Sequence, residues 1–418
     1  MENIFMSALG IGTPWFIRDM RFEVDKKRLD IWLDFKKGSR FQVENEDKGT
    51  SDYPAYDTEE KTWRHLNFFQ HECYLHARVA RVKTHDNRII TVLPPFAGKL
   101  LGFTLLFEAL LLQLCRHMPV SQVQKMTGVS DDKLWRLLDV YVEAARYGED
   151  HSNVTAVGMD ETSVAKGHDY ISLFVDMIQR KTIHISEGKG SDTVKEFAEF
   201  LVEHGGKPEQ VTDVSCDMSP AFIKGVAENL PKAEITFDKF HILKIINEAV
   251  DEVRREEAKT NPLLKKTRYI FLKNEANLTE KQREKKEELQ ISGLNLKSME
   301  ALRMRETFQQ IYAAPTCDIF EENLQKWADW VKNCGLPPME KAAQTVLHHW
   351  NGVVHWTKSR LNNGILEGLN SIIQAAKRKA RGYGKTHFAT IAFLLTGKLN
   401  FSCAVLRRCF SAGANPVR

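Results

Sequence analysis

Apolar and polar residues alternate through residues 21–95, which is the pattern of half-buried strands. In the stretch RLDIWLDF, the side chains of Leu29, Ile31, Leu33 and Phe35 fall on one side. The stretch RVARVKTHDNRIITVLPPF is rich in β-branched residues and ends at a Pro-Pro pair, a typical strand boundary. These residues predict a small β-rich module at the start of the chain.

Helical periodicity replaces this alternation after Phe96. A helix is predicted over 103–116, and Pro119 opens a short second helix that Gly128 ends. Ser130 can cap a longer amphipathic helix over 130–146, because Asp131 and Asp132 would stand in its first turn. This order predicts a helix-turn-helix. The alternative is a purely structural pair of helices.

Strands and helices alternate from residue 153 onward. The stretches NVTAVGMDETSVA, HDYISLFVDMI and KTIHISEG predict three strands, and SDTVKEFAEFLVEHG predicts a helix that Ser191 or Asp192 caps. A strand (QVTDVSCDMSP), a helix (AFIKGVAENL) and a last strand (AEITFDKFHI) follow. The pattern predicts a mixed α/β layer structure. Residues 241–345 are charge-rich and helical, and 346–396 are helical again.

Charge is distributed unevenly along the 418 residues, which suffice for two to four domains. The formal net charge is +4, but the last 51 residues hold nine Lys or Arg and no acid, so the rest carries −5. A basic end on a mildly acidic protein favours local contact with a polyanion. A solvated basic tail is the alternative.

Seven scattered cysteines, none in a CxxC pair, are typical of reduced thiols in a cytoplasmic protein. The most apolar run, residues 100–115, is too short to span a bilayer and carries Glu108, so we expect a buried helix. The N-terminus lacks the pattern of a secretion signal. We therefore expect a cytoplasmic protein without a membrane partner.

Three acids are candidates for chemistry. Asp160 and Asp217 follow predicted buried strands, where an isolated charge is costly unless it is paired or binds a metal. Either one alone could be a helix cap. Glu367 is the last acid of the chain and lies at the start of a basic helix, where it shares a face with Asn370, Ser371, Gln374 and Arg378. Three carboxylates suit Mg²⁺ or Mn²⁺, and paired ions of this kind catalyse phosphoryl transfer.

Four stretches, GMDETSVAKGHDY, CDMSPAF, FDKFHI and NNGILEGLNSIIQAAKRKARGYG, resemble the DDE transposases of bacterial insertion sequences, of the ISL3 type. The resemblance runs from about residue 63 to residue 399, with the four motifs in the family's order. It implies an RNase H-like catalytic core interrupted by a helical insertion. It also implies that Asp160, Asp217 and Glu367 are the metal-binding catalytic triad. Asp238, His241 and Asn370 are candidate supporting residues.

The N-terminal module departs from this family, whose members usually carry a zinc module with paired CxxC motifs. The corresponding stretches, FQVENEDKG and RVKTHDNR, contain no cysteine, which excludes a four-cysteine site. A residual site from His71, Cys73, His76 and His85 is the alternative, but we expect no structural zinc. The module is thus expected to be zinc-ribbon-like in shape only.

The domain boundaries expected from these patterns follow the changes in periodicity. They are a β-rich module (1–95), a helix-turn-helix (96–150), the first part of the catalytic core (151–240), a helical insertion (241–345), and the last part of the core with the basic C-terminal region (346–418). The fold class expected is therefore multidomain α/β.

The function expected is that of a DNA transposase, which would bind the terminal inverted repeats of its element and join them to target DNA. The candidate DNA contacts are Lys133, Arg136, Lys377, Arg378, Lys379 and Arg381. Two ends must be brought together, so we expect a homodimer or higher oligomer, associated with the nucleoid. The alternatives are an RNase H-like nuclease that cuts without joining and a domesticated DNA-binding regulator.

Overall fold

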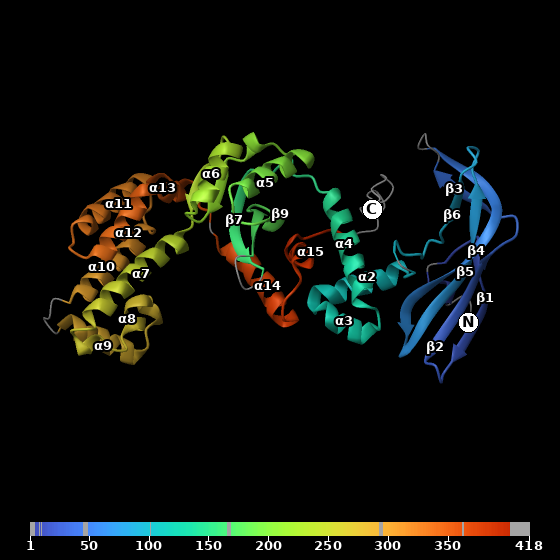
Figure 1. Cartoon of the computed structure of the whole chain (residues 1–418), viewed down its shortest axis with the longest axis horizontal. Helices are drawn as coiled ribbons and strands as arrows, with labels where there is room; N and C mark the ends of the chain where they lie inside the picture. Colours follow the sequence, from blue (N-terminus) through green and yellow to red (C-terminus); the bar gives the residue numbers. More distant parts are fainter. Residues whose placement is uncertain are drawn as a thin grey trace. The chain divides into compact units, whose positions relative to one another are not determined.

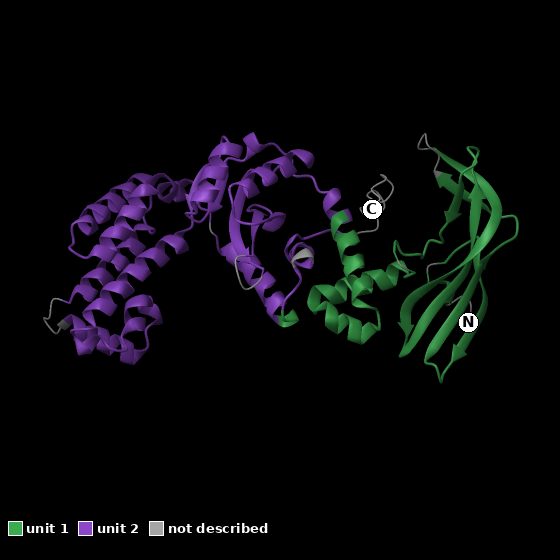
Figure 2. Ribbon diagram, in the orientation of Figure 1, with its two compact units in different colours: residues 1–143, 379–381, 416–418 green, residues 144–378, 382–415 purple. Residues whose placement is uncertain are grey.

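The computed structural model describes residues 5–401 apart from 8, 10, 45–48, 101, 165–168, 292–295 and 362. The chain forms two compact units, drawn separately in Figure 2. Unit 1 comprises residues 1–143 together with 379–381 and 416–418, and unit 2 comprises 144–378 and 382–415. The predicted FQVENEDKG stretch and the end of the basic C-terminal region lie partly outside the described residues.

Unit 1 begins with a twisted six-stranded sheet, whose long strands are drawn in blue in Figure 1. Its strands are β1 (Trp15–Glu23), β2 (Arg28–Phe35), β3 (Arg40–Glu44), β4 (Thr50–Phe68), β5 (His71–Lys83) and β6 (Ile89–Val92). The order is β1-β2-β5-β4-β3, and β6 pairs with β5. The predicted strand RLDIWLDF is β2, and its four apolar side chains are buried as expected. The β-rich module is therefore confirmed as a β-sheet.

Three helices complete unit 1: α2 (Leu105–His117), α3 (Val120–Thr127) and α4 (Asp131–Tyr147, whose last residues belong to unit 2). The predicted turn chemistry is present, because Pro119 precedes α3 and Gly128 ends it with a left-handed φ of 72°. The buried carboxylate of Glu108 on α2 accepts hydrogen bonds from the hydroxyl of Tyr141 on α4 and from the backbone N–H of Lys99 (3.1 Å). These bonds fix α2 against α4.

Unit 2 is built on a five-stranded mixed sheet of order β11-β10-β7-β8-β9. The strands are β7 (Ala156–Ser163), β8 (Tyr170–Asp176), β9 (Lys181–Glu187), β10 (Asp213–Cys216) and β11 (Glu234–Phe237). Strands β7, β8 and β9 form an antiparallel meander, whereas β10 is parallel to β7 and β11 is parallel to β10. The three strands predicted after residue 153 are thus confirmed.

Helices cover both faces of this sheet. On one face, α5 (Asp192–Glu203) and α6 (Pro220–Asn229) pack through Phe197 and Phe222 on Val157 and Met159 of β7. On the other, α14 (Gly364–Ala380) and α15 (Lys385–Thr396) pack on β7 and β8 through apolar side chains that include Leu366, Ile373 and Phe388. Side chains alternate between the two faces of the sheet along β7, so every second residue of this strand faces α14.

The chain between β11 and α14 contributes only helices in its described part, drawn from yellow-green to orange in Figure 1. They are α7 (Lys239–Glu257), α8 (Arg268–Leu272), α9 (Glu280–Ile291), α10 (Lys297–Ile311), α11 (Cys317–Lys332), α12 (Pro337–His348) and α13 (Trp350–Ser359), with short 3₁₀ turns at Pro262–Leu264 and Glu275–Asn277. A third 3₁₀ turn, Pro208–Gln210, precedes β10. Fully buried aromatic side chains, among them Phe308 and Trp327, form the core of this bundle.

Two strand ends differ from the sequence-based prediction. Strand β7 continues to Ser163, because its pairing with β8 extends that far, so Asp160 lies within the strand rather than at its end. The last strand, expected over 233–242, ends at Phe237. There the carboxylate of Asp238 accepts a hydrogen bond from the N–H of Phe240 (3.2 Å) and caps α7. A cap competes with continued strand pairing, which ends the strand.

Candidate active site

Three aspartates, Asp160, Asp217 and Asp238, lie in or directly after three neighbouring strands of the unit 2 sheet. In the parallel pairs, Ser215 of β10 lies opposite Gly158 of β7, and Cys216 lies opposite Phe237 of β11. Continued by one or two residues, this register places Asp217 beside Asp160 and Asp238 beside Asp217, at the strand spacing of about 4.8 Å. The carboxyl ends of β10 and β11 therefore meet an acidic residue of β7.

The aspartates face α14. Ser215 precedes Asp217 by two residues, and its hydroxyl donates to the buried side-chain oxygen of Asn363, immediately before α14. One strand further, the hydroxyls of Thr236 and Ser359 lie 2.8 Å apart. Because side chains two residues apart share a face, these bonds fix the face on which Asp217 and Asp238 lie.

Successive turns of α14 form side-chain hydrogen bonds with successive residues on one face of β7. The side-chain amide of Asn370 donates to the carboxylate of Asp160, and that of Gln374 donates to the hydroxyl of Thr162 (3.0 Å). Close approach requires Gly158, because a Cβ there would lie 3.0 Å from both Cδ atoms of Leu366. The helix is thus held against the strand that carries Asp160.

Electrostatics distinguish Asp160 from an ordinary surface acid. Burial is the main cause that raises the pKa of Asp160 to about 6, and the neighbouring charge of Asp217 raises it further. Burial and the charges of Asp217 and Asp160 also raise the pKa of Glu161. Acids that crowd one another in this way favour a bound cation.

His241, on the first turn of α7, supplies positive charge beside these acids. Its Nδ1 lies 2.9 Å from a carboxylate oxygen of Asp238. This hydrogen bond is the main cause that raises the pKa of His241, and the charges of Asp238, Asp217 and Asp160 act in the same direction. The imidazolium is therefore favoured next to the acidic edge, and its side chain remains 40% exposed.

The structure brings together some of the residues expected from the sequence and not others. Asp160 and Asp217 are neighbours, and Asp238, His241 and Asn370 adjoin them. Glu367 lies exposed in the first turn of α14, one helical turn before Asn370. In the described part of the chain, no three His, Cys, Asp or Glu side chains are grouped closely enough to hold one metal ion.

Oxygen donors at this edge nevertheless fit a hard divalent ion. The charge of Asp217 raises the pKa of Asp160, and the side-chain oxygen of Asn370 is buried without a hydrogen-bond partner in the described part of the chain. Unsatisfied buried oxygens and crowded carboxylates are the donors that Mg²⁺ and Mn²⁺ take.

The basic residues expected to contact DNA lie in different settings. Lys377 donates to the backbone carbonyl of Ser163 (2.8 Å) and so contacts the sheet. Arg378, Lys379 and Arg381 are exposed at or just beyond the end of α14. In unit 1, the exposed side chains on α4 include those expected from the sequence, Lys133 and Arg136.

The histidines and the cysteine of a residual zinc site do not converge. Along β5, His71 and Cys73 are on one face and His76 is on the other, where its Nε2 lies 2.5 Å from Asp30. Burial raises the pKa of the Cys73 thiol to about 12, which disfavours the thiolate that binds zinc. His85 stacks against Tyr53, with ring centroids 5.2 Å apart.

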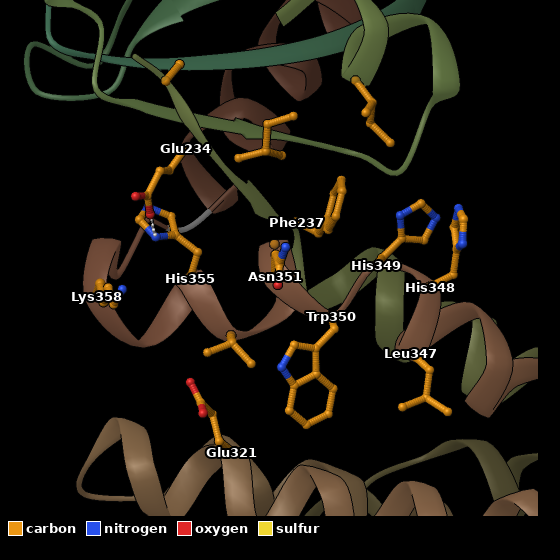
Figure 3. A pocket seen from close by; sticks show the side chains of 15 residues that line it. Glu234, Phe237, Glu321, Leu347, His348, His349, Trp350, Asn351, His355 and Lys358 are labelled. Carbon is orange, nitrogen blue, oxygen red and sulfur yellow. Dashed lines mark ion pairs between the residues drawn. The ribbon is translucent and has the colours of Figure 1, made fainter. Parts of the chain in front are cut away.

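A cavity of about 830 Å³ lies elsewhere in unit 2, along α13 and β11 (Figure 3). His355 closes one side of it, with ring nitrogens 2.7 Å from Glu234 and 3.2 Å from Asp213. These two acids begin β11 and β10, so the cavity reaches the amino ends of the strands. None of Asp160, Asp217 and Asp238 lines this cavity, although Phe237, the residue before Asp238, does.

Asn363, Ser215 and Glu161 were missed by the sequence-based reasoning. Asn363 immediately follows Asn362 in the motif NNGILEG, yet its partner Ser215 is 148 residues away, so no local pattern connects them. Glu161 directly follows Asp160, and the adjacent pair of acids was the available signal.

Comparisons with known proteins identify the two principal domains. A model of the helix-turn-helix domain of transposase family ISL3 matches residues 93–142. A model described as a transposase, of the DDE type of the same family, matches residues 157–392, more than half of the chain. A DNA-binding helix-turn-helix joined to a DDE domain defines the class of DNA transposases.

Two curated relatives agree with the family models. The chain is 28% identical over 242 residues to the transposase for insertion sequence element IS1001 of Bordetella parapertussis, a match that covers 56% of this chain and 59% of that protein. It is 24% identical over 361 residues to the IS1557 transposase of Mycobacterium tuberculosis, with 77% and 78% covered. This chain belongs to the ISL3 family of DDE transposases. Among its described helices, none combines the length and the apolar character needed to cross a bilayer.

Proposed function

We propose that this chain is a DNA transposase that binds the terminal inverted repeats of its insertion element, cleaves at the element ends and joins them to target DNA. The observation that carries the proposal is the row of Asp160 and Asp217 on neighbouring strands, inside the segment that matches the transposase family. Helix α14, which carries Glu367, contacts Asp160 through Asn370. The catalytic set proposed is therefore Asp160, Asp217 and Glu367.

The core proposed for this chemistry is RNase H-like. Its support is the sheet itself, an antiparallel meander of three strands followed by two strands parallel to the first. The domain boundaries expected from the sequence, with a helical insertion over 241–345, belong to the same proposal. In it, the helix-turn-helix places α4 on DNA, with Lys133 and Arg136 as contacts and Arg378, Lys379 and Arg381 near the backbone phosphates.

The residues divide the work of phosphoryl transfer as follows. Asp160 and Asp217 would hold Mg²⁺ or Mn²⁺, and Glu367, one helical turn before Asn370 on α14, would complete the oxygen ligands. A bound ion would activate the attacking oxygen and stabilise charge on the phosphate and the leaving oxygen. Asn370 orients the carboxylate of Asp160 by donating to it. His241, kept cationic by Asp238, is placed to contact a phosphate oxygen.

The test is cleavage and strand transfer on oligonucleotides that carry the DNA flanking the gene, with Mg²⁺ or Mn²⁺. We expect metal-dependent joining by the wild type and none by Asp160→Ala, Asp217→Ala or Glu367→Ala. Glu199→Ala is the matched control, because Glu199 is an exposed acid on α5 of the same domain. The expected size of the effect is at least about 100-fold for each triad variant and less than twofold for the control.

Other outcomes would replace the proposal. Cleavage without joining would indicate a nuclease. Binding of the ends without cutting, equal in the wild type and the alanine variants, would indicate a regulator. Since two element ends must meet, we also propose a homodimer or higher oligomer on DNA, working at the nucleoid. Light scattering of the protein with and without the end duplex measures the assembly.

A further inference from the structure

A groove of about 630 Å³ runs along α7 in the helical region between β11 and α14. The residues of α7 that line it fall on one stripe of the helix, from Phe240 through Lys244 and Asn247 to Asp251. Helix α7 starts directly after Asp238, at the candidate active site. At 1.5 Å per residue, Lys244 stands about 9 Å along the helix axis from Asp238, close to the catalytic edge.

A buried guanidinium forms the floor of this groove. Arg305 of α10 is 1% exposed, and its N–H groups donate only to neutral acceptors. These are the side-chain oxygens of Asn247 (2.7 Å) and Asn274 (2.9 Å) and the backbone carbonyls of Leu272 and Lys273 (both 3.2 Å). Burial lowers the pKa of Arg305, and the nearby charge of Glu306 offsets this only in part.

The acids near Arg305 form ion pairs with other cations, and Glu306 shares Lys286 with Glu275. Asp251 lies within ion-pair distance of three arginines, Arg254 (2.7 Å), Arg255 (3.4 Å) and Arg268 (3.7 Å). Glu306, the residue after Arg305, lies 2.9 Å from the ammonium of Lys286. The residues that line the groove include four cations and two acids, so the groove keeps a net positive charge. A buried cation whose printed hydrogen bonds all go to neutral acceptors, beneath a positive groove, favours an anion from outside.

Lys244 gives the groove an exposed cation, and in the described part of the chain no carboxylate forms an ion pair with it. Phe240, 49% exposed, adds an aromatic surface at the end nearest Asp238. A positive groove with an aromatic side chain, continuous with the helix that leaves the active site, matches the chemistry of a nucleic-acid backbone.

We infer that this groove binds the phosphate backbone of the DNA whose end is held at Asp160 and Asp217. Lys244 contacts a phosphate at the surface, and Arg305 provides the positive field beneath it. The inference rests on the proposed transposase function and extends it, because it assigns a DNA-binding role to the helical region outside both the helix-turn-helix and the catalytic edge.

The experiment measures binding of the full-length chain to a fluorescein-labelled duplex that carries the DNA flanking the gene. Fluorescence anisotropy without divalent ions avoids cleavage, and a titration between about 50 and 200 mM salt gives the number of phosphate contacts. We expect Lys244→Glu to weaken binding roughly tenfold and to reduce the salt slope by about 1. Lys332→Glu on α11 makes the same change in charge outside the groove and should change affinity by less than about twofold.

A second variant separates binding from folding. Lys244→Gln removes the charge of the exposed Lys244 without adding an acid and touches no hydrogen bond of the described helix core. We expect weaker DNA binding than in the wild type, by less than in Lys244→Glu, together with an unchanged Tm, whereas a folding defect would lower the Tm.

Three results would overturn the inference. If Lys244→Glu and Lys332→Glu weaken binding equally, the effect is one of net charge and the groove has no DNA contact. If the wild type binds no duplex at all, the proposed function fails and the inference with it. Equal salt slopes for wild type and Lys244→Glu, with normal cleavage of the end duplex, would leave the transposase function intact and reject the groove alone.

Discussion

The pKa values of two aspartates, one in each sheet of this protein, are shifted in opposite directions. In the unit 1 sheet, Asp30 is 5% exposed and accepts two hydrogen bonds from Arg28 (2.7 and 2.6 Å) and lies 2.5 Å from His76. Burial alone would raise the pKa of Asp30, but the hydrogen bonds from Arg28 and His76 bring it below its usual value. In the unit 2 sheet, burial and Asp217 raise the pKa of Asp160 to about 6.

This difference distinguishes Asp30, an acid with a structural role, from Asp160, an acid suited to binding a cation. Asp30 is hydrogen-bonded directly to Arg28 and His76, whereas Asp160 is hydrogen-bonded to a neutral amide and a backbone N–H, and the charge of His241 lowers its pKa less than burial raises it. A charge that is costly in the folded protein is retained where it serves a ligand. Burial of an acid is therefore uninformative by itself, and the identity of its neighbours decides which role it has.

The largest expected effect is on activity. Asp160→Asn should reduce strand transfer by at least about 100-fold, because an amide replaces a charged ligand of the divalent ion. Its free energy of unfolding at pH 7 should stay the same or increase, since an unfavourable buried charge is removed. Strand-transfer assays and urea denaturation of the same preparation test both. A loss of stability comparable to the Asp30 variant below would contradict the comparison.

The second prediction concerns Asp30. Asp30→Ala should lower the free energy of unfolding by about 2 kcal/mol, because it leaves Arg28 and His76 without their partner; the partial exposure of Arg28 keeps the loss below that of a fully buried pair. Asp57→Ala is the matched control in the same sheet. Asp57 pairs with Arg81 at the surface, so its removal should cost less than about 0.5 kcal/mol. Equal losses in urea denaturation would show that pairing at Asp30 has no special role.

Much of the fold was predictable because its signals are local. The alternation in RLDIWLDF, the Pro119 and Gly128 boundaries of α3 and the strands after residue 153 depend on neighbouring residues, and the structure contains them. Strand ends were less predictable. Asp160 lies inside β7 because β8 pairs beyond it, and β11 is short because Asp238 caps α7. Both outcomes depend on tertiary partners.

For the candidate site, the sequence indicated which acids to consider but not how they are arranged. Asp160 and Asp217 come together through the register of β7 and β10, which are separated along the chain by two strands and a helix. The bond between Ser215 and Asn363 spans 148 residues, and no periodicity anticipates it. The helix carrying Glu367 was expected, and its face was partly correct, because Asn370 and Gln374 do meet β7. The exposure of Glu367 itself could not be read from spacing.

A third prediction tests the contact between α14 and Asp160. Asn370→Ala should lower strand transfer about tenfold and raise the Mg²⁺ concentration for half-maximal activity by a similar factor, because the carboxylate of Asp160 loses the donor that orients it. The adjacent Ser371→Ala is the control, since Ser371 is exposed on the same helix. A rate loss that saturating Mg²⁺ does not alter at all, with an unchanged Mg²⁺ requirement, would place the role of Asn370 elsewhere.

The smallest expected effect is the dependence of stability on pH, and it follows from the sign of the shift at Asp160. Its folded pKa of about 6 lies above the ordinary 3.8, so the folded state favours the protonated acid. Without divalent ions, this one group therefore costs nothing below about pH 4, and the cost grows as the pH rises to about 6 and is constant above it. The full shift would correspond to about 3 kcal/mol, but partial exposure of Asp160 reduces this to about 1 kcal/mol.

The measurement is the difference in free energy of unfolding between wild type and Asp160→Asn from pH 4 to pH 7, with and without Mg²⁺. We expect the difference to grow with pH in the absence of Mg²⁺ and to shrink when Mg²⁺ is added, because a bound cation stabilises the ionised acid in the folded state alone. Asp30 should show the opposite sign, with stability lost only as the pH falls below about 4, since its folded pKa is lowered. A pH-independent difference at Asp160 would mean that its charge is already compensated within the chain, as at Asp30.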